Sequence, residues 1–133
     1  MARKLLLGCA LCVLVCFAGC SGSSGPPPVA VSGTVELDGK PLNDGSISLF
    51  PESGGAPAVL PVKDGKFEGQ ATPGKKKVEL RAFRMGQPTK MGNEVIEATK
   101  ENYLAAKWNT NSKLTAEVTA SGISPNKFSA KSD

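Results

Sequence analysis

The residues able to do covalent chemistry in this 133-residue chain are concentrated in its first twenty positions. Its four cysteines are Cys9, Cys12, Cys16 and Cys20, and the chain contains no histidine. Histidine is the commonest general base and metal ligand, so its absence removes Ser–His and Cys–His pairs. Cys9 and Cys12 stand in an apolar run without polar neighbours, which favours hydrophobic packing over zinc binding. The sequence therefore predicts a protein that is not an enzyme and that holds no metal or other cofactor.

The segment around these cysteines has the order of features found in a secretory signal. Arg3 and Lys4 precede an apolar run through Phe17, which is shorter than the roughly 20 residues that a membrane-spanning helix needs. The run closes with FAGC at residues 17–20. These letters resemble the lipobox of bacterial lipoproteins, with Phe17 where that family most often has leucine. The resemblance implies cleavage before Cys20 and acylation of its thiol, with palmitate among the acyl chains. Ordinary signal cleavage and an uncleaved anchor are the alternatives.

Acylation at Cys20 would make membrane lipid the first partner of the protein. Two or more acyl chains, at about 0.8 kcal/mol per buried CH₂, hold a small domain on a bilayer. Residues 21–28 read SGSSGPPP, a flexible segment followed by a stiff one, which is typical of a tether. We therefore expect a lipid-anchored, extracytoplasmic protein of the cell envelope, either periplasmic or on the cell surface.

Aromatic and basic residues in the second half are the remaining candidates for ligand binding. Tyr103 and Trp108 can present a sugar-binding platform, or they can pin a long loop to the core. The basic run at 75–77, with Arg81 and Arg84, can attract an anionic wall polymer. Strand alternation divides these side chains between two faces, which favours a solvated or edge-protecting role.

Charge and turn residues argue against two further kinds of site. Without Arg3 and Lys4, 14 basic residues face 12 acidic ones, an excess too small to predict nucleic-acid binding. Asp38, Asp44 and Asp64 each precede a glycine, but none has the clustered oxygen ligands of a calcium loop. We interpret them as turn residues.

Alternating apolar and polar residues predict short β-strands separated by glycine and proline turns. A β-hairpin is expected over 31–51, with its turn at Asp38-Gly39. Further strands are expected at 58–63, 66–68, 75–84, 113–120 and 126–130. Residues 85–108 show no clean period and are expected to form a long, mostly irregular crossover, with a short helix over 94–106 as the alternative. Seven short strands favour an all-β sandwich.

The order of the turn and strand motifs resembles the carboxypeptidase regulatory-like domain. The motifs are VxGxVxLDGKPL at 31–42, GxIxLxP at 45–51, DGKF at 64–67 and PGxxxV at 73–78. The resemblance implies a seven-stranded transthyretin-like, immunoglobulin-type β-sandwich. With the lipobox and YLAAKWN at 103–109, the chain resembles small secreted lipoproteins of planctomycete-type bacteria. Lys76 departs from the family pattern, which commonly has an aromatic residue there. Either the strand begins at Lys77, or the Lys76 stem lies along the core edge with its amine in water.

These observations together predict a signal peptide at 1–19, a lipidated cysteine with a linker at 20–28 and one β-sandwich domain at 29–133. The function expected is a non-enzymatic accessory or binding role at the envelope, toward an unknown envelope protein or polymer, with residues 86–102 as the contact surface. One alternative is a carbohydrate or cell-wall polymer binder using Tyr103, Trp108 and the basic run. Another is a structural surface protein that associates with itself through an edge strand.

Overall fold

The computed structural model describes residues 25–132. Strands make up 60% of it and helix 3%, which confirms the all-β class. The strands are β1 (Val29–Leu37), β2 (Lys40–Pro41), β3 (Asp44–Pro51), β4 (Ala58–Lys63), β5 (Lys66–Ala71), β6 (Gly74–Met85), β7 (Thr89–Met91), β8 (Glu94–Ile96), β9 (Lys100–Asn102), β10 (Leu114–Thr119), β11 (Gly122–Ser124) and β12 (Lys127–Ala130). A single 3₁₀ turn, η1 (Ala106–Trp108), is the only helical element in this part of the chain.

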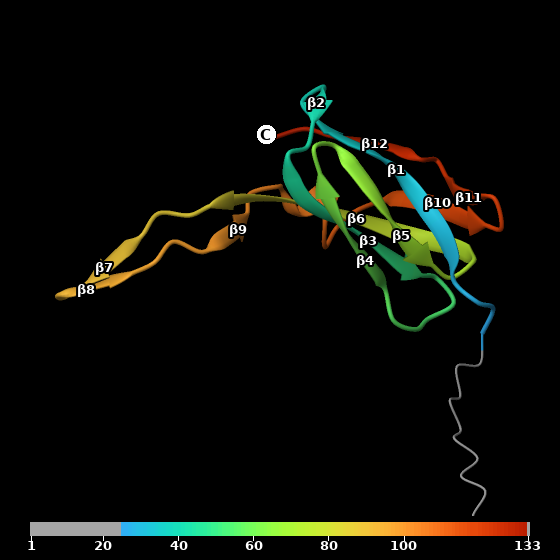
Figure 1. The fold of residues 1–133 in the computed structure, drawn as a ribbon, viewed down its shortest axis with the longest axis horizontal. Coiled ribbons are helices and arrows are strands. Elements are labelled where there is room, and N and C mark those ends of the chain that lie inside the picture. Colours follow the sequence, from blue (N-terminus) through green and yellow to red (C-terminus); the bar gives the residue numbers. More distant parts are fainter. Residues whose placement is uncertain (1–24, 133) are drawn as a thin grey trace, which may run out of the picture.

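The main sheet has the order β11-β10-β6-β3-β4-β5-β1-β12 and curls on itself (Figure 1). Because of the curl, β10 and β11 at one end of this order contact β1 near the other end. All neighbours are antiparallel except β1 and β12, which run parallel. The sheet changes layer at β4 and β5, which pair only over Val62–Phe67 and Lys63–Lys66. This arrangement is compatible with a β-sandwich.

The core lies between the two sides of the curled sheet and is mainly aliphatic. Its fully enclosed side chains include Ile47 and Leu49 of β3 and Val78, Leu80 and Ala82 of β6. The other side is lined by β1, β5 and β12, whose Phe67 and Phe128 rings lie 6.2 Å apart between centroids. Val78, Leu80 and Ala82 of β6 face this core, as do Ala116 and Val118 of β10.

Two Asp-Gly turns form as the sequence predicts. Asp38 and Gly39 have φ of 52° and 78°, and Asp64 and Gly65 have φ of 51° and 76°. A two-residue hairpin turn with both residues at positive φ is the type I′ turn, whose twist matches that of the flanking strands. The turn role of these two aspartates is confirmed, whereas the turn role expected for Asp44 is wrong, because Asp44 is the first residue of β3 and pairs with Lys63.

The hairpin expected over 31–51 is wrong in its pairing. β1 pairs with β2, β5 and β12, whereas β3 pairs with β4 and β6. The Asp38-Gly39 turn leads only into the two residues of β2, and the chain then crosses at Leu42 to the other side of the core. β1 and β3 each have one apolar face. Because the two strands lie in opposite layers, these faces are buried against each other.

The irregular crossover and the helix expected after residue 85 are both wrong. This segment forms β7, β8 and β9, and helical structure in 94–106 is limited to the start of η1 at Ala106. Together with the end of β6 they make a long, narrow projection from the body, at the left of Figure 1. An additional short strand, β11, follows a two-residue turn at Ala120 and Ser121.

The signal, lipobox and Cys20 predictions fall in residues 1–24 and lie outside the described residues. Within residues 25–132, no helix has the length and apolar character required to cross a bilayer. Gly25 to Pro28 precede β1 as exposed chain without regular structure.

Candidate functional site

The projection is a two-stranded β-ribbon, residues 83–102, which we call the arm. Its regular strand pairing is interrupted at 86–88 and 97–99. Phe83 pairs with Asn102, and Met91 pairs with Glu94, with no change of register between them. The backbone N–H of Gly86 donates to the carbonyl of Thr99 at 2.9 Å, in that same register. Gly92 and Asn93 form the two-residue turn at the tip. Gly92 has φ of 65°, a value that glycine adopts without the steric cost of a side chain.

Side chains alternate between the two sides of the ribbon within each paired stretch. Near the root, Phe83, Met85, Lys100 and Asn102 lie on one side and Arg84 and Glu101 on the other. Near the tip, Thr89, Met91, Glu94 and Ile96 lie on one side and Lys90 and Val95 on the other.

The hydrophobic side of the chain changes over within β6. In the body, Val78, Leu80 and Ala82 face the core, and the alternate positions carry charge. From Phe83 onward the two sides of the strand exchange character. The side that carries charge in the body now carries Phe83 and Met85, and the side that faces the core in the body now carries Arg84. The hydrophobic side chains Phe83 and Met85 at the root of the arm are therefore not an extension of the core.

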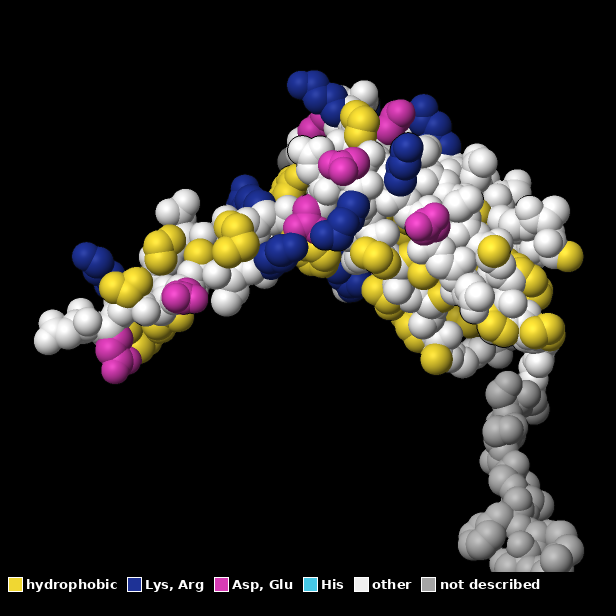
Figure 2. Space-filling model, viewed as in Figure 1, with side chains coloured by type: hydrophobic (Ala, Val, Ile, Leu, Met, Phe, Trp, Pro, Cys, Tyr) yellow, Lys and Arg dark blue, Asp and Glu magenta, His cyan; other side chains and the backbone are white. Residues whose placement is uncertain are grey.

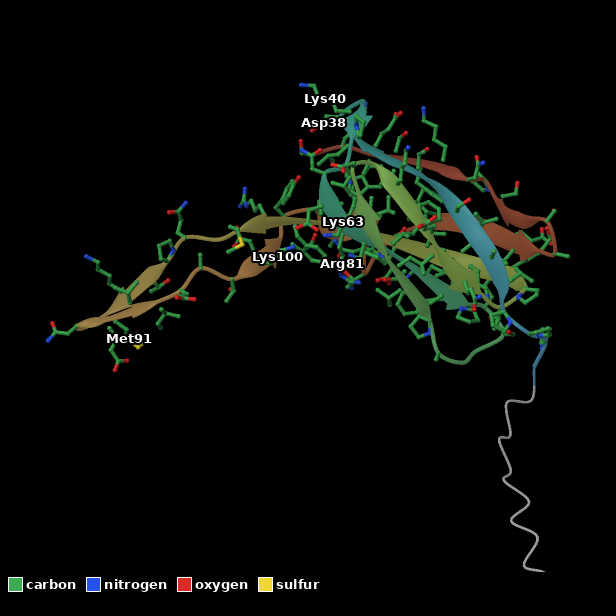
Figure 3. All side chains as sticks on the ribbon, in the orientation of Figure 1. Asp38, Lys40, Lys63, Arg81, Met91 and Lys100 are labelled. Carbon is green, nitrogen blue, oxygen red and sulfur yellow. The ribbon has the colours of Figure 1, made fainter. Side chains whose placement is uncertain are left out.

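The apolar side chains of the arm have no second layer against them. Met91 is 70% exposed, Val95 61%, Met85 60% and Ile96 48%. Figure 2 shows hydrophobic side chains along the arm, interspersed with charged ones, and Figure 3 places Met91 near the tip. Exposed hydrophobic groups gathered on one element mark an interaction surface more often than isolated ones do.

The root of the arm, in contrast, is fixed to the body by polar contacts. Lys100 Nζ lies 2.5 Å from Asp44 Oδ2, which lowers the pKa of that carboxyl. Arg84 Nε donates to Glu101 Oε1 at 2.8 Å, and its guanidinium carbon lies 5.3 Å from the centroid of the Tyr103 ring. These contacts orient the arm where it leaves the sheet, and Figure 3 places Lys100 at this point.

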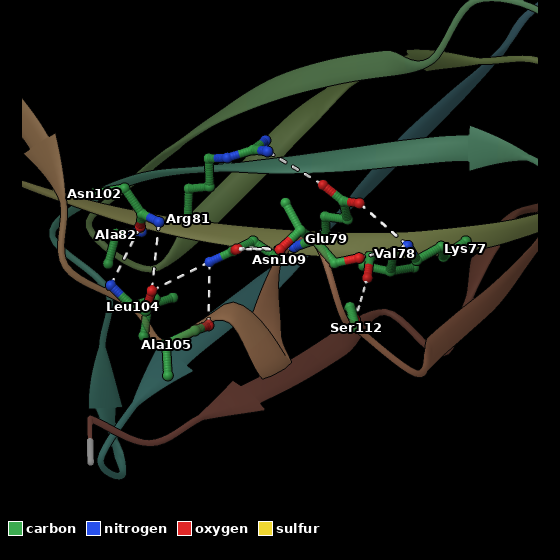
Figure 4. A network of polar contacts seen from close by, with 11 residues as sticks. Lys77, Val78, Glu79, Arg81, Ala82, Asn102, Leu104, Ala105, Asn109 and Ser112 are labelled. Carbon is green, nitrogen blue, oxygen red and sulfur yellow. Dashed lines mark hydrogen bonds and ion pairs between the residues drawn. The ribbon is translucent and has the colours of Figure 1, made fainter.

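Amide side chains cover the part of the β6 edge that no strand pairs with (Figure 4). Asn102 Oδ1 accepts from the backbone N–H groups of Ala82 at 3.1 Å and Leu104 at 3.2 Å. Ser112 Oγ donates to the Val78 carbonyl at 2.6 Å. Asn109 Nδ2 donates to the carbonyls of Leu104 and Ala105, which holds residues 104–109 in place. The segment after the arm is therefore ordered by hydrogen bonds to β6 and within itself.

A hollow of about 680 Å³ lies between the arm root and the β1–β2 turn. Its lining includes Phe83, Tyr103, Arg84, Lys40, Asp38 and Asp44. The hydroxyl and backbone N–H of Ser132 donate to Asp38, which lowers the pKa of that carboxyl. The hollow is lined by equal numbers of acidic and basic side chains, so its charge favours neither cations nor anions.

The two aromatic residues predicted to bind ligand line different hollows. Tyr103 lines the hollow at the arm root, and Trp108 lines another, of about 450 Å³, with Lys113 and Leu114. Both rings pack against the core, and Trp108 Nε1 donates to the Lys131 carbonyl at 2.9 Å. The structure does not bring the rings into one platform, and a binding role stays a prediction for each ring separately.

The basic run is divided between faces, as strand alternation predicts. Lys77 and Arg81 lie 3.3 Å and 3.2 Å from the two carboxylate oxygens of Glu79 on the outer face of β6 (Figure 4). Arg84 belongs to the arm. These cations therefore do not form one basic strip.

Lys76 points toward the interior, and β6 begins at Gly74 rather than at Lys77. The residue is 2% exposed, and its Nζ donates to Thr72 Oγ1 at 2.7 Å. Burial lowers the pKa of the amine. The expectation that the lysine stem lies against the core is confirmed, whereas the amine ends at a hydroxyl of the β5–β6 turn.

Sequence reasoning missed the arm hairpin, although residues 86–102 were chosen as the contact surface. The signal was present as Gly92-Asn93, a dipeptide suited to a two-residue turn, between segments of matched length. Lysine, glutamate and threonine break up the hydrophobic side chains on these segments, so alternation alone did not reveal them.

Comparison of the chain with protein-family models, curated proteins and solved structures finds no match.

Proposed function

We propose that this protein is a lipid-anchored, non-enzymatic binding module of the cell envelope, with the arm as its contact surface. The observation that carries the proposal is the exposure of Met85, Met91, Val95 and Ile96 on a ribbon that extends away from the core. A single two-stranded hairpin is at best marginally stable in water. An arm of this kind therefore suits a role in which a partner supplies the missing layer.

The proposal includes a carboxypeptidase regulatory-like, transthyretin-like sandwich as the scaffold. The all-β class, the aliphatic core and the two Asp-Gly turns support it. In this proposal the body is a rigid scaffold, and the arm is the part that contacts the partner. Loops and hairpins placed on a rigid sandwich are frequent binding elements.

The direction of β1 and β6 supports presentation away from a membrane. β1 runs from Val29, where the tether enters, to Leu37, and Leu37 and Phe83 line the same hollow at the arm root. The tether and the arm therefore leave from opposite ends of the body (Figure 1). Acyl chains on Cys20 would hold one end at the bilayer and leave the arm free to meet a partner.

The anchor is tested by comparing Cys20→Ser with Cys16→Ser in the full chain, since both remove one thiol from the leader region. We expect Cys20→Ser to lose incorporation of labelled palmitate and to leave the membrane fraction, while Cys16→Ser keeps both. A processed N-terminus at any other residue, or palmitate retained in Cys20→Ser, would end the lipoprotein proposal.

The contact surface is tested by shortening the arm without changing its register. Replacing residues 86–99 with Asn-Gly joins Met85 to Lys100 through a two-residue turn and leaves the root contacts in place. We expect lysine-reactive cross-linking in intact cells to lose the adducts that the natural chain forms. A matched shortening of loop 53–56 should leave them unchanged. Adducts that survive removal of the arm would contradict the proposal.

A further inference from the structure

We propose that a groove on the body binds a phosphate group through Lys63 and Lys66, which we call the lysine pair. The groove has a volume of about 550 Å³ and is lined by residues of β1, β4 and β5 together with Asn126. That volume lies within the range of small-molecule sites in proteins. The groove is separate from the arm, so this inference goes beyond the proposed function and does not depend on it.

The two lysines lie directly opposite each other in the sheet. Lys63 ends β4, Lys66 begins β5, and the two are partners across the Asp64-Gly65 turn. Side chains of directly opposite residues project from the same side of a sheet, and like charges placed there repel each other. Both side chains line the groove. A phosphate bound between them would replace this repulsion with two attractive contacts.

Neither member of the lysine pair has an ion-pair partner within residues 25–132. Other lysines of the body do have one, since Lys127 Nζ lies 2.9 Å from Glu36 Oε1. Asp44 lies opposite Lys63 on β3, but Lys100 binds its carboxylate at 2.5 Å. Each ammonium group of the pair can therefore offer its three donors to a ligand.

The rest of the lining adds polar groups and retains a net positive charge. Ser32 and Thr34 of β1 carry hydroxyls and Asn126 carries an amide, and all three can donate to phosphate oxygens. Glu68 is the only acidic residue among the described residues that line the groove, against the two lysines. A phosphate monoester carries close to two negative charges at neutral pH, and lysine is a frequent phosphate ligand.

Protection of open strand edges is the other role that lysines often have on a sheet. β4 and β5 pair only through Val62–Phe67 and Lys63–Lys66, so the stretches that carry Pro61 and Glu68 have open edges between the two strands. The lysine pair belongs to the paired stretch and not to the open one. Edge protection therefore does not account for its position, whereas binding in the adjacent groove does.

The test titrates inorganic phosphate into the nitrogen-15-labelled full-length chain in a non-ionic detergent at constant ionic strength. Lys63→Gln with Lys66→Gln removes the pair, whereas Lys75→Gln with Lys90→Gln removes the same charge from exposed positions outside the groove. We expect saturable amide shifts around the groove, with a Kd raised about fivefold or more by the first double variant and less than about twofold by the second. Equal effects of the two double variants, or no saturable shift in the natural chain, would overturn the proposal.

A second pair of variants tests whether the phosphate lies in the groove. Glu68→Gln removes an acidic group from the lining and should lower the phosphate Kd about twofold or more, because a charge that repels the ligand is lost. Glu117→Gln, on β10 and outside the groove, should leave the Kd unchanged. An unchanged Kd in Glu68→Gln, or equal decreases in both variants, would overturn the groove as the site.

Two further probes identify the source of the phosphate group. A short linear polyphosphate represents an anionic polymer, and glycerophosphoglycerol represents the headgroup of a phospholipid. The probe that binds more tightly than inorganic phosphate, and that loses this affinity when the lysine pair is replaced, identifies the source. If neither probe binds more tightly, the ligand is the free anion. Binding of all three that ignores replacement of the lysine pair would overturn the proposal.

Discussion

The body and the arm are made from the same kind of β-strand, and β6 belongs to both. In the body, Leu80 is fully enclosed because β1 and β5 supply a second layer, whereas Met85, five residues later on the same strand, is 60% exposed. Backbone pairing continues through both regions. The comparison teaches that pairing alone forms a strand here, and that burial depends on whether another layer covers it.

The largest expected effect is on the free energy of unfolding, which should fall for a substitution in the body and change little for one in the arm. Leu80→Ala should lower the free energy of unfolding by about 2–5 kcal/mol, because it leaves a cavity in an enclosed core. Ile96→Ala in the arm should change it by less than about 0.5 kcal/mol, since that residue contacts little of the body. Urea denaturation of the two variants measures both values, and a large loss for Ile96→Ala would show that the arm belongs to the core.

The second comparison uses asparagines at the two ends of the arm. Asn102→Ala removes the acceptor for the backbone N–H groups of Ala82 and Leu104 and should cost about 1–3 kcal/mol, because the Ala82 group is enclosed. Asn93→Ala in the exposed tip turn should cost less than about 0.5 kcal/mol. Thermal unfolding of both variants checks the difference, and equal losses would contradict the anchoring role of Asn102.

A third comparison concerns two lysines, one in each region. Burial lowers the pKa of Lys76 from its ordinary 10.5, so the charged amine destabilises the fold below the lowered pKa, and this cost is relieved as the pH rises toward 10.5. Lys76→Met should therefore stabilise the protein at pH 7 by about 0.5–2 kcal/mol. It should also remove the rise in stability above neutral pH, and Lys90→Met in the arm should do neither.

Denaturant titrations at a series of pH values from neutrality upward test the lysine comparison. A stability profile that rises equally in the natural chain and in Lys76→Met would assign the pH dependence to other groups. A destabilised Lys76→Met would mean that the bond from the Lys76 amine to Thr72 outweighs the cost of burying the charge.

The smallest expected effect is at the junction of the two regions. The hydrogen bond from Lys100 holds the pKa of Asp44 below its ordinary 3.8. The contact is therefore complete above that value and is lost as the pH falls through the lowered pKa. Lys100→Gln should raise the Asp44 midpoint toward 3.8 in a carbon-13 carboxyl titration, while Lys90→Gln should leave it unchanged. An unchanged midpoint in Lys100→Gln would show that the junction does not depend on this ion pair.

Most of the body was predictable from the sequence because its signals are local. Alternation at Val78, Leu80 and Ala82 specifies which face is buried, and Asp-Gly dipeptides specify their turns. Which strands become neighbours is not local information. The alternation of 31–37 and 45–51 fits a hairpin as well as it fits two opposite layers, so the pairing of β1 and β3 was predicted incorrectly.

The candidate site was predictable in position but not in form. The length of 86–102 identified it as a contact surface, while its β-ribbon structure was missed because Lys90, Glu94 and Thr99 interrupt the hydrophobic pattern. The separation of Tyr103 and Trp108 also depends on tertiary structure. The 3₁₀ turn and the Asn109 contacts direct the two rings to different hollows, and nothing in their spacing indicates this.

The only tryptophan of the chain gives the body a built-in optical reporter. Its indole N–H is held by the carbonyl of Lys131, so release of the C-terminal segment will change the emission wavelength of Trp108. The arm contains no such fluorophore. A fluorescence-monitored unfolding curve will therefore follow the body alone and remain blind to fraying of the ribbon, which amide proton exchange will detect.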